Sequence, residues 1–348
     1  MIGGSVPSHL ARFAVGVVCA ALVFGAGVVL RPLRGGADPV VIRVAYGATP
    51  ATMGGLVFEK TDVMRHYGKS YTVERSFFPA STQQIQGFAA KAIDVGFLAY
   101  PSFAFAVVNA QADLTIWGGG LRECVPGYYS QTWAVLGSSP IKAVEDLKGK
   151  RIAVPAFGTG TDGGLRIFLK KSGLDPQRDV SIVEVNWPNQ EAMLRQGKVD
   201  AAVFLPDFWR AAVAKGDIRK VFDFCPGTGY VQTLVEVVRS DFLKEHRAAM
   251  QDFVEDYIRG LQWFLDPAHH KEAVDITAKF TKRPASAFEG WAFTKEDEYR
   301  DPWAWPDMAA FQRNVDQLYE IGMLPKKLDV TKYADLSLPT EAKKRIEK

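Results

Sequence analysis

The chain repeats one order of secondary structure twice, and this repetition limits the folds open to it. The first copy is predicted to run strand, helix, strand, helix, strand over residues 40–46, 56–67, 71–77, 81–92 and 94–99. Short β-branched and aliphatic runs indicate the strands, and apolar residues at helical spacing indicate the helices. Alternating β and α elements are typical of parallel sheets covered by helices.

The second copy follows the same order. Its strands are predicted at residues 151–154, 180–185 and 199–205, with intervening helices after a glycine-rich turn and at residues 190–196. Two further strand-like segments, residues 128–136 and 230–238, resemble each other, because each begins near a Gly-Tyr pair and reaches a Gln-Thr pair. Two such crossings between two α/β lobes predict a two-strand hinge that permits closure around a ligand.

The predicted domain organisation is therefore discontinuous. Lobe 1 combines residues 38–127 with residues 233–348, and lobe 2 comprises residues 128–232 with hinge strands at both ends. The mainly helical, tryptophan-rich segment after residue 240 is expected to return to lobe 1 and wrap it. A chain of 348 residues is long enough for two domains that each bury a core.

Residues 1–37 have the layout of an export signal. Arg12 precedes an apolar run over residues 13–30, and Ala37 is the expected last residue before cleavage. The run is long enough for an uncleaved membrane anchor as well. A lipoprotein signal at Cys19 is a third interpretation. In every case the folded part lies outside the cytoplasm, which predicts a periplasmic or other extracytoplasmic location.

Composition excludes several classes of function. The net charge is +3, and no block of Lys and Arg forms a nucleic-acid footprint. The sequence has no Cys-x-x-Cys and no His/Cys cluster at metal spacing, so no metal site is predicted. Nucleotide-binding glycine motifs are also missing. We therefore expect no cofactor and no nucleic-acid partner.

Cys124 and Cys225 pose an open question, since an oxidising compartment favours a disulfide. Each cysteine stands at the same offset before its Gln-Thr pair, at Gln131 and Gln232. Equal offsets on antiparallel crossings place the cysteines at opposite ends, unless a pseudo-two-fold axis passes close to them. Bridging requires Cα atoms within roughly 7 Å. Two buried free thiols are therefore the expectation.

Several segments resemble a known family. Residues 146–155 read Asp-Leu-Lys-Gly-Lys-Arg-Ile-Ala-Val-Pro, and supporting segments are residues 87–94, 197–203 and 238–242. In this order they resemble periplasmic solute-binding proteins of ABC importers, in the sulfonate/taurine/nitrate-binding family of the thiamine-precursor-binding-like superfamily. The resemblance implies a two-lobed periplasmic-binding-protein fold of type II, α/β in class, with a mainly parallel sheet wrapped by helices in each lobe. It also implies a monomer that delivers a small organic anion or zwitterion to a permease.

Candidate ligand-binding residues follow the predicted strands, because ligands in open α/β sheets lie at the carboxyl ends of strands. They are Thr49, Ser81, Thr82, Gln83, Tyr100, Ser102, Arg122, Gly158, Thr159, Thr161, Trp187 and Asp207. Gly158 to Thr161 open a helix, where amides and hydroxyls favour an anionic group. The structural alternative is a plain turn in which Thr161 or Asp162 caps the helix.

The other candidates also have two interpretations. Ser81 forms a predicted capping box with Gln84, which leaves Thr82 and Gln83 to face the cleft. Arg122 can grip a sulfonate or carboxylate bidentately, or it can pair with Glu123 or another acid. The strand-end and aromatic candidates can line a pocket, or they can pack a sheet against its helices.

Capture of a sulfonate, taurine-like zwitterion or aromatic acid is the predicted function, with nitrate the least favoured ligand. The alternative is an enzyme on the same fold, desulfinase-like or pyrimidine-precursor synthase-like. The desulfinases that the chain resembles carry a nucleophilic cysteine after the first strand, and residues 47–50 contain none. No counterpart of the synthases' cysteine-rich motif is present. A sensory ectodomain is disfavoured, because about a dozen residues before the apolar run cannot form a signalling domain. We therefore predict a binding protein and not an enzyme.

Overall fold

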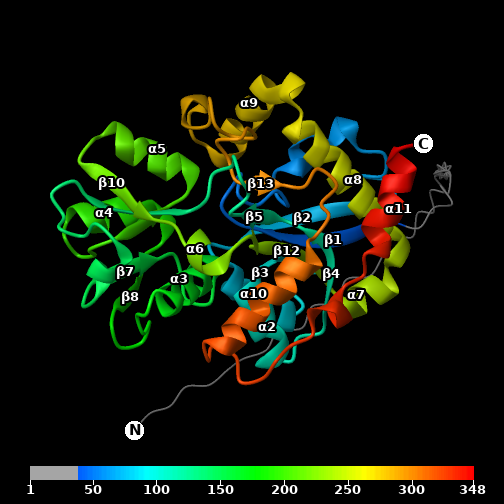
Figure 1. The fold of residues 1–348 in the computed structure, drawn as a ribbon. Helices are drawn as coiled ribbons and strands as arrows, with labels where there is room; N and C mark the ends of the chain where they lie inside the picture. The colour runs from blue at the N-terminus through cyan, green and yellow to red at the C-terminus, as the bar shows by residue number, and fades with distance from the viewer. Residues whose placement is uncertain (1–37) are drawn as a thin grey trace, which may run out of the picture. The chain divides into compact units, whose positions relative to one another are not determined.

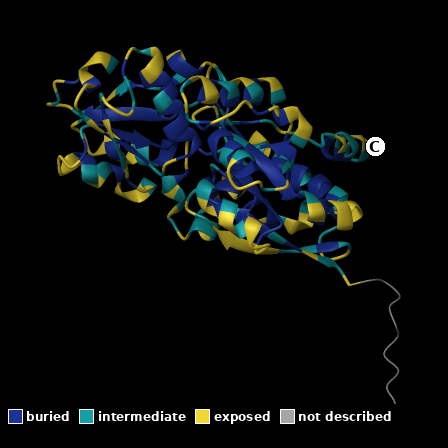
Figure 2. Ribbon diagram, turned by 90° about the horizontal axis from the view of Figure 1, so that it is seen from below, coloured by how far each residue is buried: buried dark blue, intermediate teal, exposed yellow. Residues whose placement is uncertain are grey.

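The computed structural model describes residues 38–348, which hold two α/β assemblies of strands and helices (Figure 1). The predicted export signal or anchor, residues 1–37, lies outside the described residues. Within the described range no helix is both long and apolar enough to cross a membrane. Figure 2 shows buried strands in the centre of both assemblies, with exposed residues on the surrounding helices and loops and on edge strands such as β2 (Tyr71–Phe77).

The first sheet has five strands in the order β2-β1-β3-β12-β4. Its strands are β1 (Val40–Tyr46), β2 (Tyr71–Phe77), β3 (Val95–Ala99), β4 (Leu114–Gly119) and β12 (Leu234–Arg239). β1 pairs in parallel with β2 and β3, whereas β12 runs antiparallel between β3 and β4. This antiparallel strand, β12, forms after the chain returns from the second assembly to the first sheet.

The second assembly repeats this order. Its strands are β6 (Thr132–Leu136), β7 (Arg151–Val154), β8 (Ser181–Glu184), β9 (Ala202–Phe204) and β10 (Ile218–Phe222). β7 pairs in parallel with β8, and an Ile152–Ala201 bridge joins β7 to the segment that leads into β9. β6 runs antiparallel between β9 and β10. The predicted α/β class is confirmed, with one antiparallel strand in each mainly parallel assembly.

The crossings between the assemblies pair with each other. β5 (Leu121–Glu123) lies between β11 (Val231–Gln232) and β13 (Tyr299–Arg300), and both pairings are antiparallel. β11 falls within the second expected crossing, residues 230–238, whereas its partner β5 precedes the first, which was expected at residues 128–136. The late segment adds β13 as a third strand at their side.

Helices cover both faces of the first sheet, because alternate side chains of a strand point to opposite faces. Val235 and Val237 of β12 pack in the core with α2 (Tyr100–Val108) and α10 (Met308–Glu320). Val238 instead belongs to the core beneath α8 (Arg247–Leu265). The remaining helices here are α1 (Gln84–Ala89), α7 (Ser240–Glu245), α9 (His270–Thr281) and α11 (Ser337–Ile346).

Helices also lie on both sides of the second assembly. Leu165 and Leu169 of α3 (Gly160–Lys171) share a core with Trp133 and Val154. A separate cluster includes Leu194 and is completed by residues of α5. The helices of this second cluster are α4 (Gln190–Arg195) and α5 (Pro206–Ala214). The short α6 (Cys225–Thr228) packs against α3.

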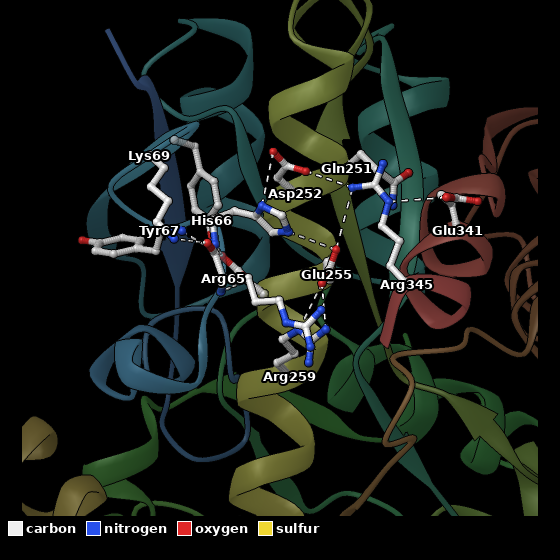
Figure 3. Close-up of polar contacts among 12 residues, drawn as sticks. Arg65, His66, Tyr67, Lys69, Gln251, Asp252, Glu255, Arg259, Glu341 and Arg345 are labelled. Carbon is white, nitrogen blue, oxygen red and sulfur yellow. Dashed lines mark hydrogen bonds and ion pairs between the residues drawn. The ribbon is translucent and has the colours of Figure 1, made fainter. Parts of the chain in front are cut away.

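An ionic network on α8 fastens neighbouring segments to the first sheet (Figure 3). Asp256 accepts hydrogen bonds from the amides of Arg65, His66 and Tyr67, and from the Tyr71 hydroxyl at 3.0 Å. Because these four donors share one buried carboxylate, the loop before β2 is tied to α8.

Glu255, one residue earlier, lies in the same network. Arg259 Nη2 donates to it at 2.9 Å and His66 Nε2 lies 3.1 Å away. Burial raises the pKa of Glu255, but the hydrogen bonds from Arg259 and His66 outweigh burial, so the net pKa lies below the ordinary value. Arg345 of α11 pairs with Asp252 at 3.0 Å, which attaches the last helix to α8.

Two local predictions in the first half are wrong. The helix expected over residues 56–67 is replaced by two 3₁₀ turns, Val57–Glu59 and Thr61–Val63, because Lys60 between them is not helical. The capping box of Ser81 and Gln84 does not form. The Ser81 hydroxyl lies 2.7 Å from the Ser102 hydroxyl, and Gln84 Oε1 accepts from the Phe97 amide.

The expectation of two free thiols is also wrong, because Cys124 and Cys225 form a disulfide with their Cα atoms 5.5 Å apart. Cys124 directly follows β5, but Cys225 opens the helical turn α6. Gly229, with φ of +67°, then reverses the chain before β11. The argument from equal offsets assumed extended chain on both sides, and the helical turn removes that assumption.

Candidate functional site

A cavity of about 520 Å³ lies where strands of both assemblies end. Residues following β1, β7, β8 and β9 line it, which is where ligands bind in open α/β sheets. The late segment between α9 and β13 supplies part of the wall. The lining residues used below are Thr49, Phe77, Gln83, Trp187, Asp207, Phe208, Arg283, Trp291, Asp297 and Glu298.

A recess of about 80 Å³ adjoins this cavity, and the two share lining residues such as Trp187 and Leu205. The recess is rich in hydroxyl and amide groups. These belong to Thr52, Ser81, Gln131, Thr159, Thr161 and Thr233. A ligand that fills the cavity can therefore place a polar end in the recess.

The start of α3 forms one side of the recess. Thr159 is the N-cap and its hydroxyl accepts from the Asp162 amide, while Thr161 donates to Gln131 Oε1 at 2.6 Å. The amides of Gly160 and Thr161 belong to the first turn, which has no intrahelical acceptors. Asp162 does not oppose an incoming anion strongly, because Arg166 pairs with it at 2.7 Å. The geometry suits an anionic group.

The outer cavity has apolar walls. Trp187, Phe208 and Trp291 line it, and Phe77 is 57% exposed at its edge. Burying such surfaces against a ligand supplies affinity without fixing its polar groups. The shape therefore accommodates an organic ligand larger than an inorganic anion.

Three acidic residues in the cavity wall differ in their partners. Asp207 pairs with Arg283 at 2.6 Å, and Asp297 pairs with Arg300 at 3.0 Å. Burial raises the pKa of Asp207, and Arg283 opposes that shift. Neither carboxyl oxygen of Glu298 has a hydrogen-bond partner among the described residues. Burial, followed by the charges of Glu123 and Asp297, raises the pKa of Glu298 well above its usual value.

The structure brings most of the predicted residues together. Thr49, Gln83, Trp187 and Asp207 line the cavity, and Ser81, Thr159 and Thr161 line the recess. Thr82 lies in a neighbouring depression that Gln83 also borders. Whether these side chains contact a ligand remains a prediction.

Five predicted residues do not line the cavity or the recess: Thr82, Tyr100, Ser102, Arg122 and Gly158. Tyr100 is buried, and its hydroxyl donates to the Gly160 carbonyl at 3.4 Å. Ser102 Oγ donates to the Gly158 carbonyl at 2.9 Å. Both side chains therefore stabilise the loop that leads into α3. Arg122 bonds to Gln232 Oε1 at 2.9 Å and to the Trp305 carbonyl. Its acidic neighbour is Asp301, at 3.7 Å, and not the Glu123 considered above.

Sequence reasoning missed the contribution of the late segment. Arg283, Trp291 and Glu298 lie outside both strand–helix repeats, and no spacing signal connects them with the strand ends. Gln131 and Thr233 carried a signal, because they belong to the repeated Gln-Thr pairs, but those pairs were interpreted only as hinge segments.

Comparison with known proteins finds similarity to solute-binding proteins. Residues 123–270 match the family model described as NMT1/THI5 like. The chain is 26% identical over 296 residues to a protein of Escherichia coli (strain K12) provisionally named an aliphatic sulfonates-binding protein, a match that covers 84% of this chain and 88% of the relative. The resemblance identified in the sequence is confirmed.

Solved structures agree on the fold. The alkanesulfonate-binding protein from Xanthomonas axonopodis pv. citri bound to MOPS superposes with a TM-score of 0.68 at 20% identity, over 86% of this chain and 99% of the other. A desulfurization enzyme superposes with a TM-score of 0.59 at 16% identity, over 88% and 99%. At these identities the likeness shows the periplasmic-binding-protein fold, which binding proteins and an enzyme share.

Proposed function

We propose that this chain, with its NMT1/THI5-like segment and periplasmic-binding-protein fold, is the solute-binding component of an ABC importer for a sulfonate-type organic anion or zwitterion. The observation that carries the proposal is the cavity of about 520 Å³ at the strand ends, with apolar walls and a hydroxyl-lined recess at the start of α3. The Escherichia coli and Xanthomonas relatives are named for sulfonate binding.

The anionic end of the ligand occupies the recess in this proposal. The Gly160 and Thr161 amides supply donors, and the dipole of α3 favours negative charge there. The apolar walls around Trp187 and Phe208 then cover the organic part. Aromatic acids fit the same description, whereas nitrate leaves the apolar walls unused.

Ligand capture proceeds by lobe closure. We assign lobe 1 to residues 38–127 and 233–348, and lobe 2 to residues 128–232. The pairing of β5 with β11 joins them, with β13 alongside. A ligand that contacts both lobes binds the closed state more tightly and shifts the equilibrium toward it. The closed, monomeric form then docks on the permease.

Binding rather than catalysis suits the site. Both cysteines of the described chain are joined in a disulfide, so neither supplies a thiolate nucleophile. The segment after β1 that lines the cavity, residues 48–51, contains no cysteine. The enzyme alternative therefore lacks the nucleophile expected of a desulfinase-like chain.

The disulfide also supports export, because such bonds persist in oxidising compartments such as the bacterial periplasm. We therefore place the folded part outside the cytoplasm. Cleavage or retention of residues 1–37 as an anchor stays a prediction.

Calorimetric titration of the purified protein with alkanesulfonates, aromatic sulfonates, aromatic carboxylates and nitrate tests the proposal. We expect saturable one-to-one binding of a sulfonate and none of nitrate. Thr161→Val removes a recess hydroxyl and should weaken sulfonate binding about tenfold. Thr277→Val removes a buried helical hydroxyl bonded to the Ala273 carbonyl, away from the cavity, and should leave affinity unchanged. Absence of binding across the whole panel would contradict the proposed function.

A further inference from the structure

Glu298 is a buried carboxyl group without a hydrogen-bond partner within residues 38–348. It precedes β13, lines the cavity and is 2% exposed. Both of its carboxyl oxygens lack hydrogen-bond partners among the described residues. Buried polar side chains are nearly always hydrogen-bonded. An exception at a cavity wall points to a partner that comes from outside the chain.

Each nearby guanidinium already pairs with a carboxylate, although Arg300 Nε has no hydrogen-bond partner among the described residues. Arg283 pairs with Asp207 at 2.6 Å, and Arg300 donates to Asp297 at 3.0 Å and to the Pro50 carbonyl at 2.8 Å. Each positive charge in this part of the wall therefore has its own carboxylate. Glu298 is the acid in excess, and the group that complements it carries positive charge or hydrogen-bond donors.

Other neighbours do not serve as partners either. Glu123 accepts from the Gln131 amide and the Thr233 hydroxyl, both at 3.0 Å. The Tyr129 hydroxyl donates to the Phe204 carbonyl at 2.8 Å. These groups surround Glu298 with acidic and committed side chains, which disfavours an anionic ligand group at this position.

Glu298 also borders a second cavity of about 780 Å³, which Lys295 and His270 line. The charges that act on Glu298 are, from the largest, those of Glu123, Asp297, Arg300 and Asp207. Asp297 and Asp207 line the first cavity, and Arg300 lines the second. Two of the three neighbouring carboxylates therefore belong to the wall of the ligand cavity.

Resting on the proposed function, we propose that Glu298 accepts hydrogen bonds from a protonated amino group of the ligand. The ligand is then a zwitterion. Its anionic end lies in the recess at the start of α3, its amino end lies at Glu298, and the apolar walls cover the connection between them. Glu298 thus determines specificity within the class of sulfonates.

Binding of an ammonium group also changes the protonation of Glu298. Without ligand, burial raises the pKa of Glu298 well above its usual value, which favours the uncharged carboxyl group. An ammonium group beside it favours the carboxylate, because an opposite charge stabilises the ionised form. Binding of an amino-sulfonate then releases a proton, and its affinity rises with pH until Glu298 is ionised in the free protein.

Two matched pairs of probes test the inference by calorimetry on the purified protein: 2-aminoethanesulfonate with ethanesulfonate, and 4-(aminomethyl)benzenesulfonate with 4-methylbenzenesulfonate. In at least one pair we expect the amino member to bind at least tenfold more tightly. Glu298→Gln should reduce that preference below threefold and leave the affinity for the amine-free member unchanged. Glu296→Gln, two residues away with an exposed side chain, is the control and should keep the full preference.

Thermal unfolding of both variants shows whether they are folded, and titration in buffers of different ionisation enthalpy measures the released proton. Equal affinity within both pairs, or a preference that survives Glu298→Gln, would overturn the role of Glu298 while leaving sulfonate capture intact. If none of the four probes binds while another sulfonate of the wider panel does, the inference fails and the proposed function stands. If nothing in that panel binds, both fail.

Discussion

Glu255 and Asp256 of the α8 network and Glu298 at the cavity wall are similarly buried but differ in what surrounds them. Asp256 is fully buried and holds three backbone amides and the Tyr71 hydroxyl. Glu298 is 2% exposed and holds no partner within residues 38–348. Burial of an ionisable group costs free energy unless hydrogen bonds or a counter-charge compensate it. The network acid is compensated by the chain itself, whereas the cavity acid is left for a ligand.

The contrast separates structural from functional burial. Glu255 and Asp256 fasten the loop before β2 to a helix of the first sheet, so their removal should affect folding. Glu298 fastens nothing, so its removal should affect ligand choice. Glu236 lies between these extremes, because it is buried and accepts one hydrogen bond, from the Tyr257 hydroxyl at 3.1 Å.

The largest expected effect is on the network. Asp256→Asn removes the charge and leaves several buried donors without a good acceptor, so the free energy of unfolding should fall by about 3 kcal/mol. Urea unfolding followed by circular dichroism measures it. A fall below about 1 kcal/mol would show that the network does not stabilise the fold.

The next effect is on the pH dependence of stability. Burial raises the pKa of Glu236 to about 7, so the folded state holds this proton more tightly than the unfolded chain. Its contribution to stability is therefore fully present below the unfolded pKa and is lost as the pH rises through about 7. Glu236→Gln should reduce the fall in the free energy of unfolding over this pH range by on the order of 2 kcal/mol.

The pKa of Glu255 is shifted in the opposite direction, so its removal should have the opposite effect on the pH dependence of stability. Its net pKa is lowered, so its contribution is present above the unfolded pKa and is lost as the pH falls. Glu255→Gln should therefore change the acid side of the stability profile and leave the neutral side parallel to wild type. Identical profiles for the Glu236 and Glu255 variants would contradict the distinction between them.

A smaller effect is expected at the paired acid of the cavity. Arg283→Met leaves Asp207 without its cation, but the guanidinium is partly exposed, so the loss of stability should be about 1 kcal/mol. The pKa of Asp207, already raised by burial, should rise further. Denaturant unfolding at two pH values measures both effects, and a variant with unchanged stability and pH response would show that the pair is not formed in solution.

The smallest effect on stability is expected at the unpartnered acid. Glu298→Gln removes an uncompensated buried carboxyl group, so the free energy of unfolding should stay unchanged or rise by up to about 1 kcal/mol. Thermal unfolding of wild type and variant side by side measures this. A loss of 2 kcal/mol or more would mean that Glu298 has a structural partner and belongs with the network acids.

Local patterns predicted many of the strands and the strand–helix order along the chain, because alternation and turn residues act over a few neighbours. They also predicted the helix start around Thr159 and Thr161. They could not predict Glu298, Arg283 or the bond from Arg300 to the Pro50 carbonyl, which joins residues 250 positions apart. The helical turn at Cys225 escaped prediction for a related reason, since only the packing of α6 against α3 shows that the chain is not extended there.

Small-angle X-ray scattering with and without ligand tests the central claim, capture of a solute between two lobes, most directly. The ligand is a sulfonate that calorimetry has shown to bind, added at saturation. We expect a smaller radius of gyration in the bound protein, because the lobes close about the β5–β11 pair. An unchanged radius of gyration at saturation would contradict lobe closure around the ligand.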